Sequence, residues 1–192
     1  MCDSGETVSF GQLDQRANQV AQVLRSCGAR RGDHIALLLK NERRFLETCF
    51  GADRAGVYYT TISTRLLADE VAYIVRDCAA RLLLVSADLA PLLSALRPLL
   101  PPGLRCFVTG GAAEGFEPWE DVVDSAAGTP IADPAQGLDM LYSSGTTGRP
   151  KGVVLSQRNI LSGVASAYRA KAFGFGEEVL AYLPMAWIGD FS

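Results

Sequence analysis

Residues 141–153 read LYSSGTTGRPKGV, and no other stretch of the chain gathers so many side chains that could bind an anion. Glycines allow positive φ and close backbone approach, so that successive N–H groups can converge on one anionic oxygen. Hydroxyls add short donors, Arg149 and Lys151 add positive charge, and Pro150 fixes the backbone between them. The stretch predicts a phosphate-binding loop. The residues predicted to contact phosphate are Ser143, Ser144, Gly145, Thr146, Thr147, Gly148 and Lys151.

The spacing of this loop excludes two common phosphate-binding motifs. A Walker A loop needs G-x-x-x-x-G-K-[ST], whereas Lys151 lies three residues after Gly148 and precedes another glycine. The dinucleotide pattern G-x-G-x-x-G is also missing, and the apolar run GVVLS that follows indicates a strand instead of a helix. We therefore predict a loop between two strands. The alternative is a polar hairpin turn that binds no ligand.

The segment YSSGTTGRPKGV resembles the phosphate loop of the adenylate-forming superfamily, which includes acyl-CoA synthetases, luciferases and peptide-synthetase adenylation domains. The resemblance implies that residues 143–151 hold the β- and γ-phosphates of ATP while a carboxylate attacks the α-phosphorus. The products of that step would be an acyl adenylate and pyrophosphate, and coenzyme A would then accept the acyl group.

Two further stretches, AGVYYTTISTRL and ADEVAYIVRDC, resemble the opening of fatty-acid-type acyl-CoA synthetases. They imply a carboxylic acid substrate, specifically a fatty acid. Neither stretch carries catalytic groups, and Tyr58 and Tyr59 are interpreted as sheet residues because strands favour tyrosine. Leu67 stands where the resemblance leads us to expect a Thr or Pro, which removes a side-chain cap from the helix that follows.

Composition and charge limit the function classes. The chain has 192 residues, 48% hydrophobic and 20% charged, with a net charge of −3, which is typical of a globular protein without a nucleic-acid-binding surface. The first ten residues lack the pattern of a secretory signal, and no apolar run reaches the length of a transmembrane segment, so we expect a cytoplasmic protein. Five scattered cysteines and the single His34 have no zinc-binding spacing, so we expect reduced thiols and no metal site of that kind.

Helical and strand patterns alternate along the first 109 residues, which predicts an α/β fold of parallel β-α-β units. The first helix should span Phe10 to Cys27, because Ser9 and Gln12 form a capping box and Gly28 can end it. Its core-facing stripe is predicted to contain Phe10, Leu13, Ala17, Val20, Leu24 and Cys27, with Gln12, Gln15, Arg16, Gln19 and Gln22 on the opposite side. The remaining predicted elements are strands at HIALLLK, VYYTTI, RLLLVS and LRCFVT, and helices at 42–55, 68–78 and 88–96.

Residues 110–134 are rich in Gly, Ala and Pro, and we interpret them as a surface excursion with one short amphipathic piece at 118–123. They lead into a predicted strand at 137–143. After the loop we predict a helix at 158–171, with Ile160, Leu161, Val164, Ala167 and Tyr168 on one side, and a last strand at 177–184.

The final residues, LPMAWIGDFS, follow that strand, and the resemblance implies that Trp187 and Gly189 line the substrate pocket. The superfamily often has a histidine where this chain has Trp187, so the departure concerns substrate shape. The alternative is an interior aromatic cluster that covers a sheet.

The resemblance also implies that residues 1–192 are the N-terminal portion of one adenylation domain, with the sheet incomplete. The glutamate that binds Mg²⁺, the aspartate that binds ribose and the small C-terminal domain would then lie beyond this chain. Such a piece is expected to have little activity alone, because adenylation needs several of these charges together. The alternative is a non-catalytic nucleotide- or protein-binding remnant of the same fold.

Overall fold

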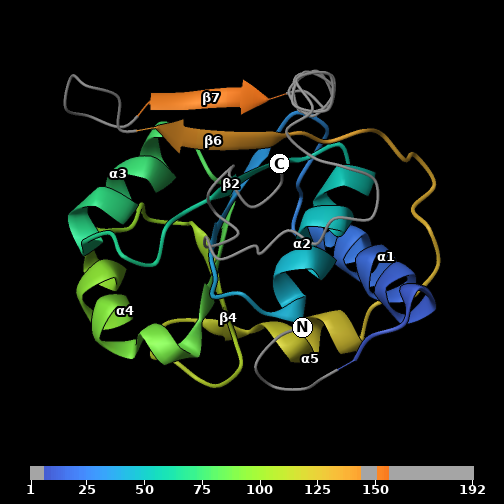
Figure 1. Cartoon of the computed structure of the whole chain (residues 1–192), viewed down its shortest axis with the longest axis horizontal. Helices are drawn as coiled ribbons and strands as arrows, with labels where there is room; N and C mark the ends of the chain where they lie inside the picture. Colours follow the sequence, from blue (N-terminus) through green and yellow to red (C-terminus); the bar gives the residue numbers. More distant parts are fainter. Residues whose placement is uncertain (1–6, 144–150, 156–192) are drawn as a thin grey trace, which may run out of the picture.

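The computed structural model describes residues 7–143 and 151–155. In these residues seven strands form one sheet in the order β5-β4-β3-β1-β2-β6-β7. Helices cover both of its faces, with α3 and α4 on one side and α1, α2 and α5 on the other (Figure 1). The elements are α1 (Phe10–Ser26), β1 (His34–Leu38), α2 (Arg43–Arg54), β2 (Tyr58–Thr61), α3 (Ala68–Asp77), β3 (Leu82–Ser86), η1 (Ala87–Leu89), α4 (Ala90–Leu96), η2 (Arg97–Leu99), β4 (Arg105–Thr109), β5 (Glu117–Pro118), α5 (Trp119–Asp124), β6 (Asp139–Ser143) and β7 (Lys151–Leu155).

The first six of these strands are parallel, and β7 alone pairs antiparallel, with β6. Strand β1 lies in the middle, where Ile35 pairs with Tyr59 of β2 on one side and with Leu82 of β3 on the other. The prediction of an α/β fold built from parallel β-α-β units is therefore confirmed.

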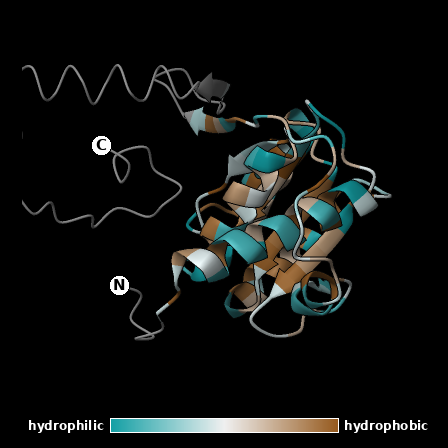
Figure 2. Ribbon diagram, turned by 90° about the vertical axis from the view of Figure 1, so that its right-hand side faces the viewer, coloured by the Kyte–Doolittle hydropathy of each residue, from teal (hydrophilic) through white to brown (hydrophobic). Residues whose placement is uncertain are grey.

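The sheet separates two hydrophobic cores, and β1 contributes alternate residues to each. Ile35 and Leu37 pack with α1, α2 and α5, whereas Ala36 and Leu38 pack with α3 and α4. Because both faces are covered, the strand reads as a continuous apolar run and not as an alternating one. Figure 2 shows the hydrophobic residues gathered between the helices and the sheet.

Helix α1 begins where the sequence predicts. The backbone N–H of Ser9 donates to Gln12 Oε1 at 2.8 Å, and the N–H of Gln12 donates to Ser9 Oγ at 3.2 Å. At the other end, Gly28 has a φ of 81°, a left-handed conformation that favours glycine after a helix.

The predicted division of α1 into a buried side and an exposed side is wrong at two positions, Phe10 and Gln19. Phe10 is 92% exposed, because the first residue of the helix projects past the packing interface. Gln19, which we placed on the solvent side, is only 7% exposed. Its amide remains satisfied there, because Nε2 donates to the carbonyl of Ala126 at 3.1 Å and Oε1 accepts from Arg16 Nη1 at 3.1 Å.

Our interpretation of residues 110–134 as an irregular surface segment was wrong, because part of the segment joins the sheet and part of it is buried in the core. Strand β5 extends the sheet beside β4, and α5 buries Trp119 (1% exposed) and Val123 against the core. The Trp119 ring meets the ring of Phe107 edge-on, with centroids 5.2 Å apart. The chain that follows α5 lies along α1, where side chains of that helix donate to backbone carbonyls of residues 126–130. The segment thus completes the α1–α2 layer.

Helix α3 starts after Leu67 without a capping side chain from that residue, as predicted from the sequence. Glu70 compensates, because its Oε2 accepts a hydrogen bond of 2.8 Å from the Leu67 backbone N–H. The Leu67 N–H would otherwise lack a partner at the start of the helix, and it is hydrogen-bonded to a side chain of the helix itself.

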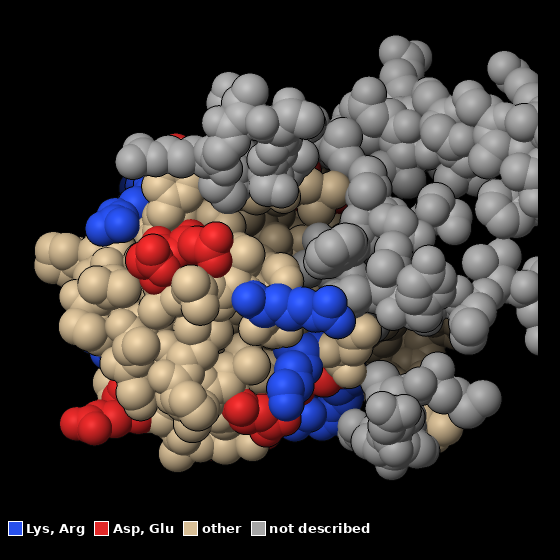
Figure 3. All heavy atoms as spheres, turned by 60° about the vertical axis from the view of Figure 1, so that its left-hand side comes forward, with Lys and Arg blue, Asp and Glu red and all other residues tan. Residues whose placement is uncertain are grey.

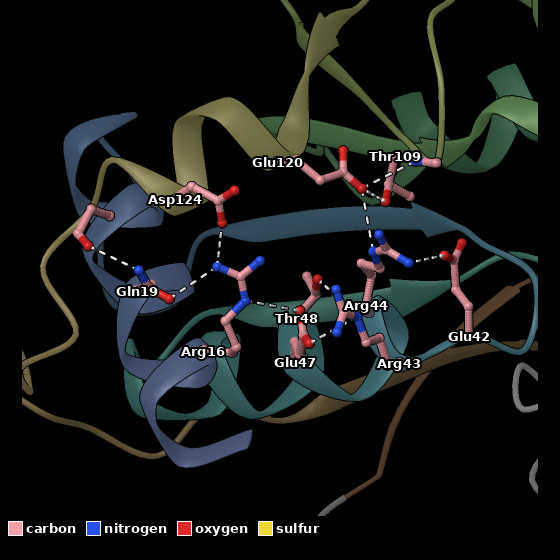
Figure 4. Close-up of polar contacts among 12 residues, drawn as sticks. Arg16, Gln19, Glu42, Arg43, Arg44, Glu47, Thr48, Thr109, Glu120 and Asp124 are labelled. Atoms are coloured by element: carbon pink, nitrogen blue, oxygen red, sulfur yellow. Dashed lines mark hydrogen bonds and ion pairs between the residues drawn. The ribbon is translucent and has the colours of Figure 1, made fainter. Parts of the chain in front are cut away.

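A polar cluster joins the end of β4 to α2 and α5 (Figure 4). Glu120 Oε1 accepts from Thr109 Oγ1 at 2.6 Å and from the Gly110 N–H at 3.1 Å, and it lies 3.2 Å from Arg44 Nε. Partial burial by itself would raise the pKa of the Glu120 carboxyl, but the hydrogen bonds and the Arg44 charge outweigh it, so the pKa lies below its ordinary value.

We predict that Glu120→Gln lowers the free energy of unfolding at neutral pH by about 1 kcal/mol, since the pair with Arg44 is partly screened by solvent. A carboxyl whose pKa is lowered by folding stabilises above its ordinary pKa and loses that contribution as pH falls. The difference between the two proteins should therefore shrink as pH falls below the ordinary pKa of a glutamate, about 4.3, and vanish once pH is below the lowered pKa of Glu120. Urea unfolding across pH measures it, with Glu114→Gln on the exposed loop as control. A difference that persists in acid would contradict the charge-based explanation.

Candidate functional site

The predicted phosphate loop connects the strands of a β-hairpin, as expected. Strands β6 and β7 pair antiparallel with Ser143 opposite Lys151, so these two residues lie side by side at the base of the loop. Strand β6 is also parallel to β2, and Ser143 stands at its carboxyl end, the end at which α/β sheets bind ligands.

Several residues predicted to be functional lie outside the described residues. They are Ser144, Gly145, Thr146, Thr147 and Gly148 of the loop, and Trp187 and Gly189 of the predicted pocket. The same is true of the predicted helix at 158–171 and the predicted strand at 177–184. Their assigned roles remain predictions.

Gly152, next to Lys151, packs closely against the opposite strand. A Cβ atom at this position would lie 2.8 Å from Met140 Sδ and 3.2 Å from Cε2 of Tyr142, the residue that Gly152 faces in the hairpin. The tyrosine ring can cover the β7 backbone only because residue 152 has no side chain. No role was predicted for this glycine, although it directly follows Lys151 in the sequence.

Tyr142 also ties the hairpin to α3, a contact that sequence reasoning missed. Its hydroxyl donates to Asp77 Oδ2 at 2.6 Å, and the hydroxyl of Tyr73 lies 3.4 Å from the other oxygen of the same carboxylate. Burial, and then the nearby Asp77 carboxylate, raise the pKa of Tyr142 above its ordinary value, so the phenol stays protonated as the donor. Residue 142 directly precedes the loop, and its anchor fixes where the loop begins.

We predict that Tyr142→Phe lowers the free energy of unfolding by about 0.5–1.5 kcal/mol, the net contribution of one hydrogen bond. Chemical denaturation followed by circular dichroism measures the change. Tyr73→Phe is the matched control, because its longer contact to the same carboxylate should contribute less. An equal loss in both variants would mean that the Tyr142–Asp77 bond is not the stronger of the two.

A groove lies between α2 and the strands β2 and β6, with a volume of about 260 Å³. We call it the α2–β6 groove. It is mostly apolar, and its lining includes Phe45, Cys49, Phe50, Asp53, Tyr59 and Asp139. Tyr59, interpreted from the sequence as a sheet residue, lies in β2 and presents part of its side chain here.

The groove contains two carboxylates, Asp53 and Asp139. Burial, reinforced by repulsion from Asp139, raises the pKa of Asp53 to about 6, and burial also raises the pKa of Asp139. In the described part of the chain the structure shows no ion pair for either carboxylate. Both carboxylates therefore accept a proton more readily than a carboxylate in water.

In the ranges 7–143 and 151–155, no three His, Cys, Asp or Glu side chains converge as metal ligands. None of the helices in these ranges combines the length and apolar character needed to cross a membrane. On the face drawn in Figure 3, Lys and Arg side chains lie near Asp and Glu side chains instead of forming a continuous positive surface.

Comparison with known proteins identifies relatives over nearly the whole sequence. Residues 1–192 match the model of the AMP-binding enzyme family. The long-chain-fatty-acid–CoA ligase FadD13 of Mycobacterium tuberculosis is 33% identical over 181 residues, covering 93% of this chain and 35% of that protein. The fatty acid–[acyl-carrier-protein] ligase ScoC of Streptomyces coeruleorubidus is 32% identical over 163 residues, covering 84% and 30%.

A solved structure of the anthranilate CoA ligase AuaEII with anthranoyl-AMP superposes with a TM-score of 0.74 at 32% identity, covering 85% of this chain and 32% of the other. The chain spans about a third of the length of the curated relatives named above.

Proposed function

Because the chain belongs to the AMP-binding enzyme family, we propose that its β6–β7 hairpin binds the phosphates of ATP in an ATP-dependent acid–thiol ligase. The family membership confirms the resemblance recognised in residues 142–153. The observation that carries the proposal is the hairpin register, which sets Ser143 opposite Lys151 at the two ends of a loop rich in glycine and hydroxyl groups.

Lys151 would supply a charge-assisted contact to a β- or γ-phosphate oxygen, and the hydroxyls and backbone N–H groups of residues 143–148 would donate to the others. These contacts hold the pyrophosphate portion of ATP in place while a carboxylate oxygen attacks the α-phosphorus. The bond from that phosphorus to the bridging oxygen breaks, and pyrophosphate leaves with its electron pair. The thiol of coenzyme A then attacks the acyl carbon and AMP departs.

Mg²⁺ would offset the charge of the phosphates. No described residue is assigned to the metal. For the acid, we propose a fatty acid, with Trp187 and Gly189 in the wall of its pocket. The relatives include ligases named for fatty acids and one named for anthranilate, so an aromatic acid is the competing substrate class.

ATP–pyrophosphate exchange by the complete protein tests the proposal. We expect exchange that requires a carboxylic acid and is faster with saturated fatty acids than with benzoate or anthranilate. Exchange only with aromatic acids would overturn the substrate class. ATP binding without exchange for any acid would favour the second candidate, a non-catalytic nucleotide-binding protein that retains the family's fold.

A further inference from the structure

We propose that Asp77, the last residue of α3, is a positioning residue for the phosphate loop. Its carboxylate holds the Tyr142 phenol and, through it, the loop-bearing end of the β6–β7 hairpin in the orientation that binds ATP. The inference rests on the proposed function of the hairpin, and it adds a residue that lies far outside the loop in sequence.

The end of the hairpin that carries the loop extends past its pairing with the rest of the sheet. Strand β6 pairs with β2 at Asp139 and Met140, the partners of Tyr59 and Thr60. In the described part of the chain, residues 141–143 of β6 pair with β7 alone. A two-stranded ribbon is strongly twisted and is only marginally stable without further packing. Contacts outside the strand pairing must therefore set the direction in which this end of the hairpin points.

Tyr142 makes a contact that fixes this direction. Its hydroxyl donates to Asp77 Oδ2 at 2.6 Å, which joins the hairpin to a residue 65 positions earlier in the sequence. Its side chain is partly buried and packs against the hydrophobic core that α3 and α4 cover. In Figure 1 the arrowhead of β6 lies next to α3. One side-chain hydrogen bond thus ties the residue at the second-last position of β6 to this helix.

The place of Asp77 at the end of α3 is explained by this partner. A carboxylate at the C-terminal end of a helix is repelled by the partial negative charge of the last carbonyl groups, so it is unfavourable for the helix itself. The same carboxylate accepts from Tyr142 and lies 3.4 Å from the hydroxyl of Tyr73, one turn earlier. In the residues that the structure describes, no ion pair is formed by Asp77. The tyrosine hydroxyls are therefore the contacts that favour an aspartate here.

Tyr142 is adjacent to both ends of the loop. It directly precedes Ser143, and in the hairpin it faces Gly152, the residue after Lys151. A Cβ atom at Gly152 would lie 3.2 Å from Cε2 and from Cζ of the tyrosine, so the ring lies over the β7 backbone. Because the ring spans both strands, a movement that followed loss of the Asp77 contact would shift the backbone at both ends of the loop together.

The orientation of the loop determines how tightly ATP binds. A loop that adopts its binding orientation for only part of the time has an affinity reduced in proportion to that fraction. Loss of the bond between Asp77 and Tyr142 should therefore raise the KM for ATP about three- to tenfold, the equivalent of one hydrogen bond. The KM for the carboxylic acid should stay unchanged, because in the proposed function the loop contacts the phosphates of ATP.

ATP–pyrophosphate exchange by the complete protein tests the inference with Asp77→Ala, Tyr142→Phe and the double variant. Each single change should raise the KM for ATP, and the double variant should match them, because either change removes the same bond. Asp69→Ala is the matched control, since it removes an exposed carboxylate from the first turn of the same helix and should leave both KM values unchanged. An unchanged KM for ATP in Asp77→Ala, additive effects in the double variant, or an equal rise in the KM for the acid would overturn the proposal.

Amide hydrogen exchange of the complete protein without nucleotide separates this inference from the proposed function. In Asp77→Ala, protected amides of residues 141–143 and 151–153 should exchange about three- to tenfold faster, while those of 139–140 and 154–155 keep their rates. If the wild-type protein showed no ATP–pyrophosphate exchange with any acid, the proposed function would fail, but this local change would still support the anchoring of the hairpin by Asp77. Equal hydrogen-exchange rates in the wild type and Asp77→Ala, or faster rates throughout α3, would overturn the inference even if ATP–pyrophosphate exchange were normal.

Discussion

Trp119→Ala is expected to lower the free energy of unfolding by about 3–5 kcal/mol, the usual cost of truncating a large buried aromatic side chain. Trp119 is 1% exposed and is among the largest fully buried side chains of the described residues. It packs edge-on against Phe107 and holds the short helix α5 against β4. Its loss leaves a cavity that this six-residue helix cannot close by itself.

Urea unfolding followed by far-ultraviolet circular dichroism measures the effect, because Trp187 complicates fluorescence. Trp119→Phe keeps an aromatic ring beside Phe107 and should cost much less than Trp119→Ala. We also expect residues 125–134 to become more sensitive to proteolysis in the alanine variant, since they follow α5 directly and hydrogen bonds from side chains of α1, such as Gln19 and Gln22, are then left to hold them. A loss below about 1 kcal/mol, typical of a surface substitution, would show that α5 is not part of the core.

Lys151→Ala in the complete protein is expected to weaken the use of ATP by about 10- to 150-fold. A hydrogen bond to a charged group contributes about 1.5–3 kcal/mol, and each 1.4 kcal/mol corresponds to a factor of ten. Under the proposed function Lys151 would make such a contact, and the hairpin register fixes its backbone opposite Ser143 at the base of the loop. ATP–pyrophosphate exchange measured over a range of ATP concentrations gives the change.

Arg81→Ala is the control for Lys151→Ala, since Arg81 is an exposed cation that pairs with Asp33 3.2 Å away and is distant in sequence from the loop. It should leave exchange unaltered. If Lys151→Ala leaves the ATP dependence unchanged, the phosphate-binding assignment is wrong and the polar-turn alternative gains support. If Arg81→Ala weakened ATP–pyrophosphate exchange as much as Lys151→Ala, the loss would instead indicate a general effect of removing positive charge.

The sequence by itself determined the α/β class, most element boundaries and the hairpin around the loop. These features follow from local patterns: the periodicity of apolar residues, the capping box of Ser9 and Gln12, and the glycines that end helices and form turns. The family could be recognised for a similar reason, because phosphate binding by backbone and hydroxyl groups depends on contiguous residues. The prediction that Ser143 and Lys151 bind phosphate therefore rests on one short stretch.

Tertiary structure decided the features that join residues distant in sequence. Strand β5 and the burial of Trp119 were missed because a two-residue strand has no periodicity, and its stability comes from pairing with β4. Gln19 was placed on the wrong side because its partner, Ala126, is more than a hundred residues away. The bond from Tyr142 to Asp77 and the joining of Asp53 to Asp139 in one groove also span separate elements. Such contacts depend on how the chain packs, and no local pattern encodes that.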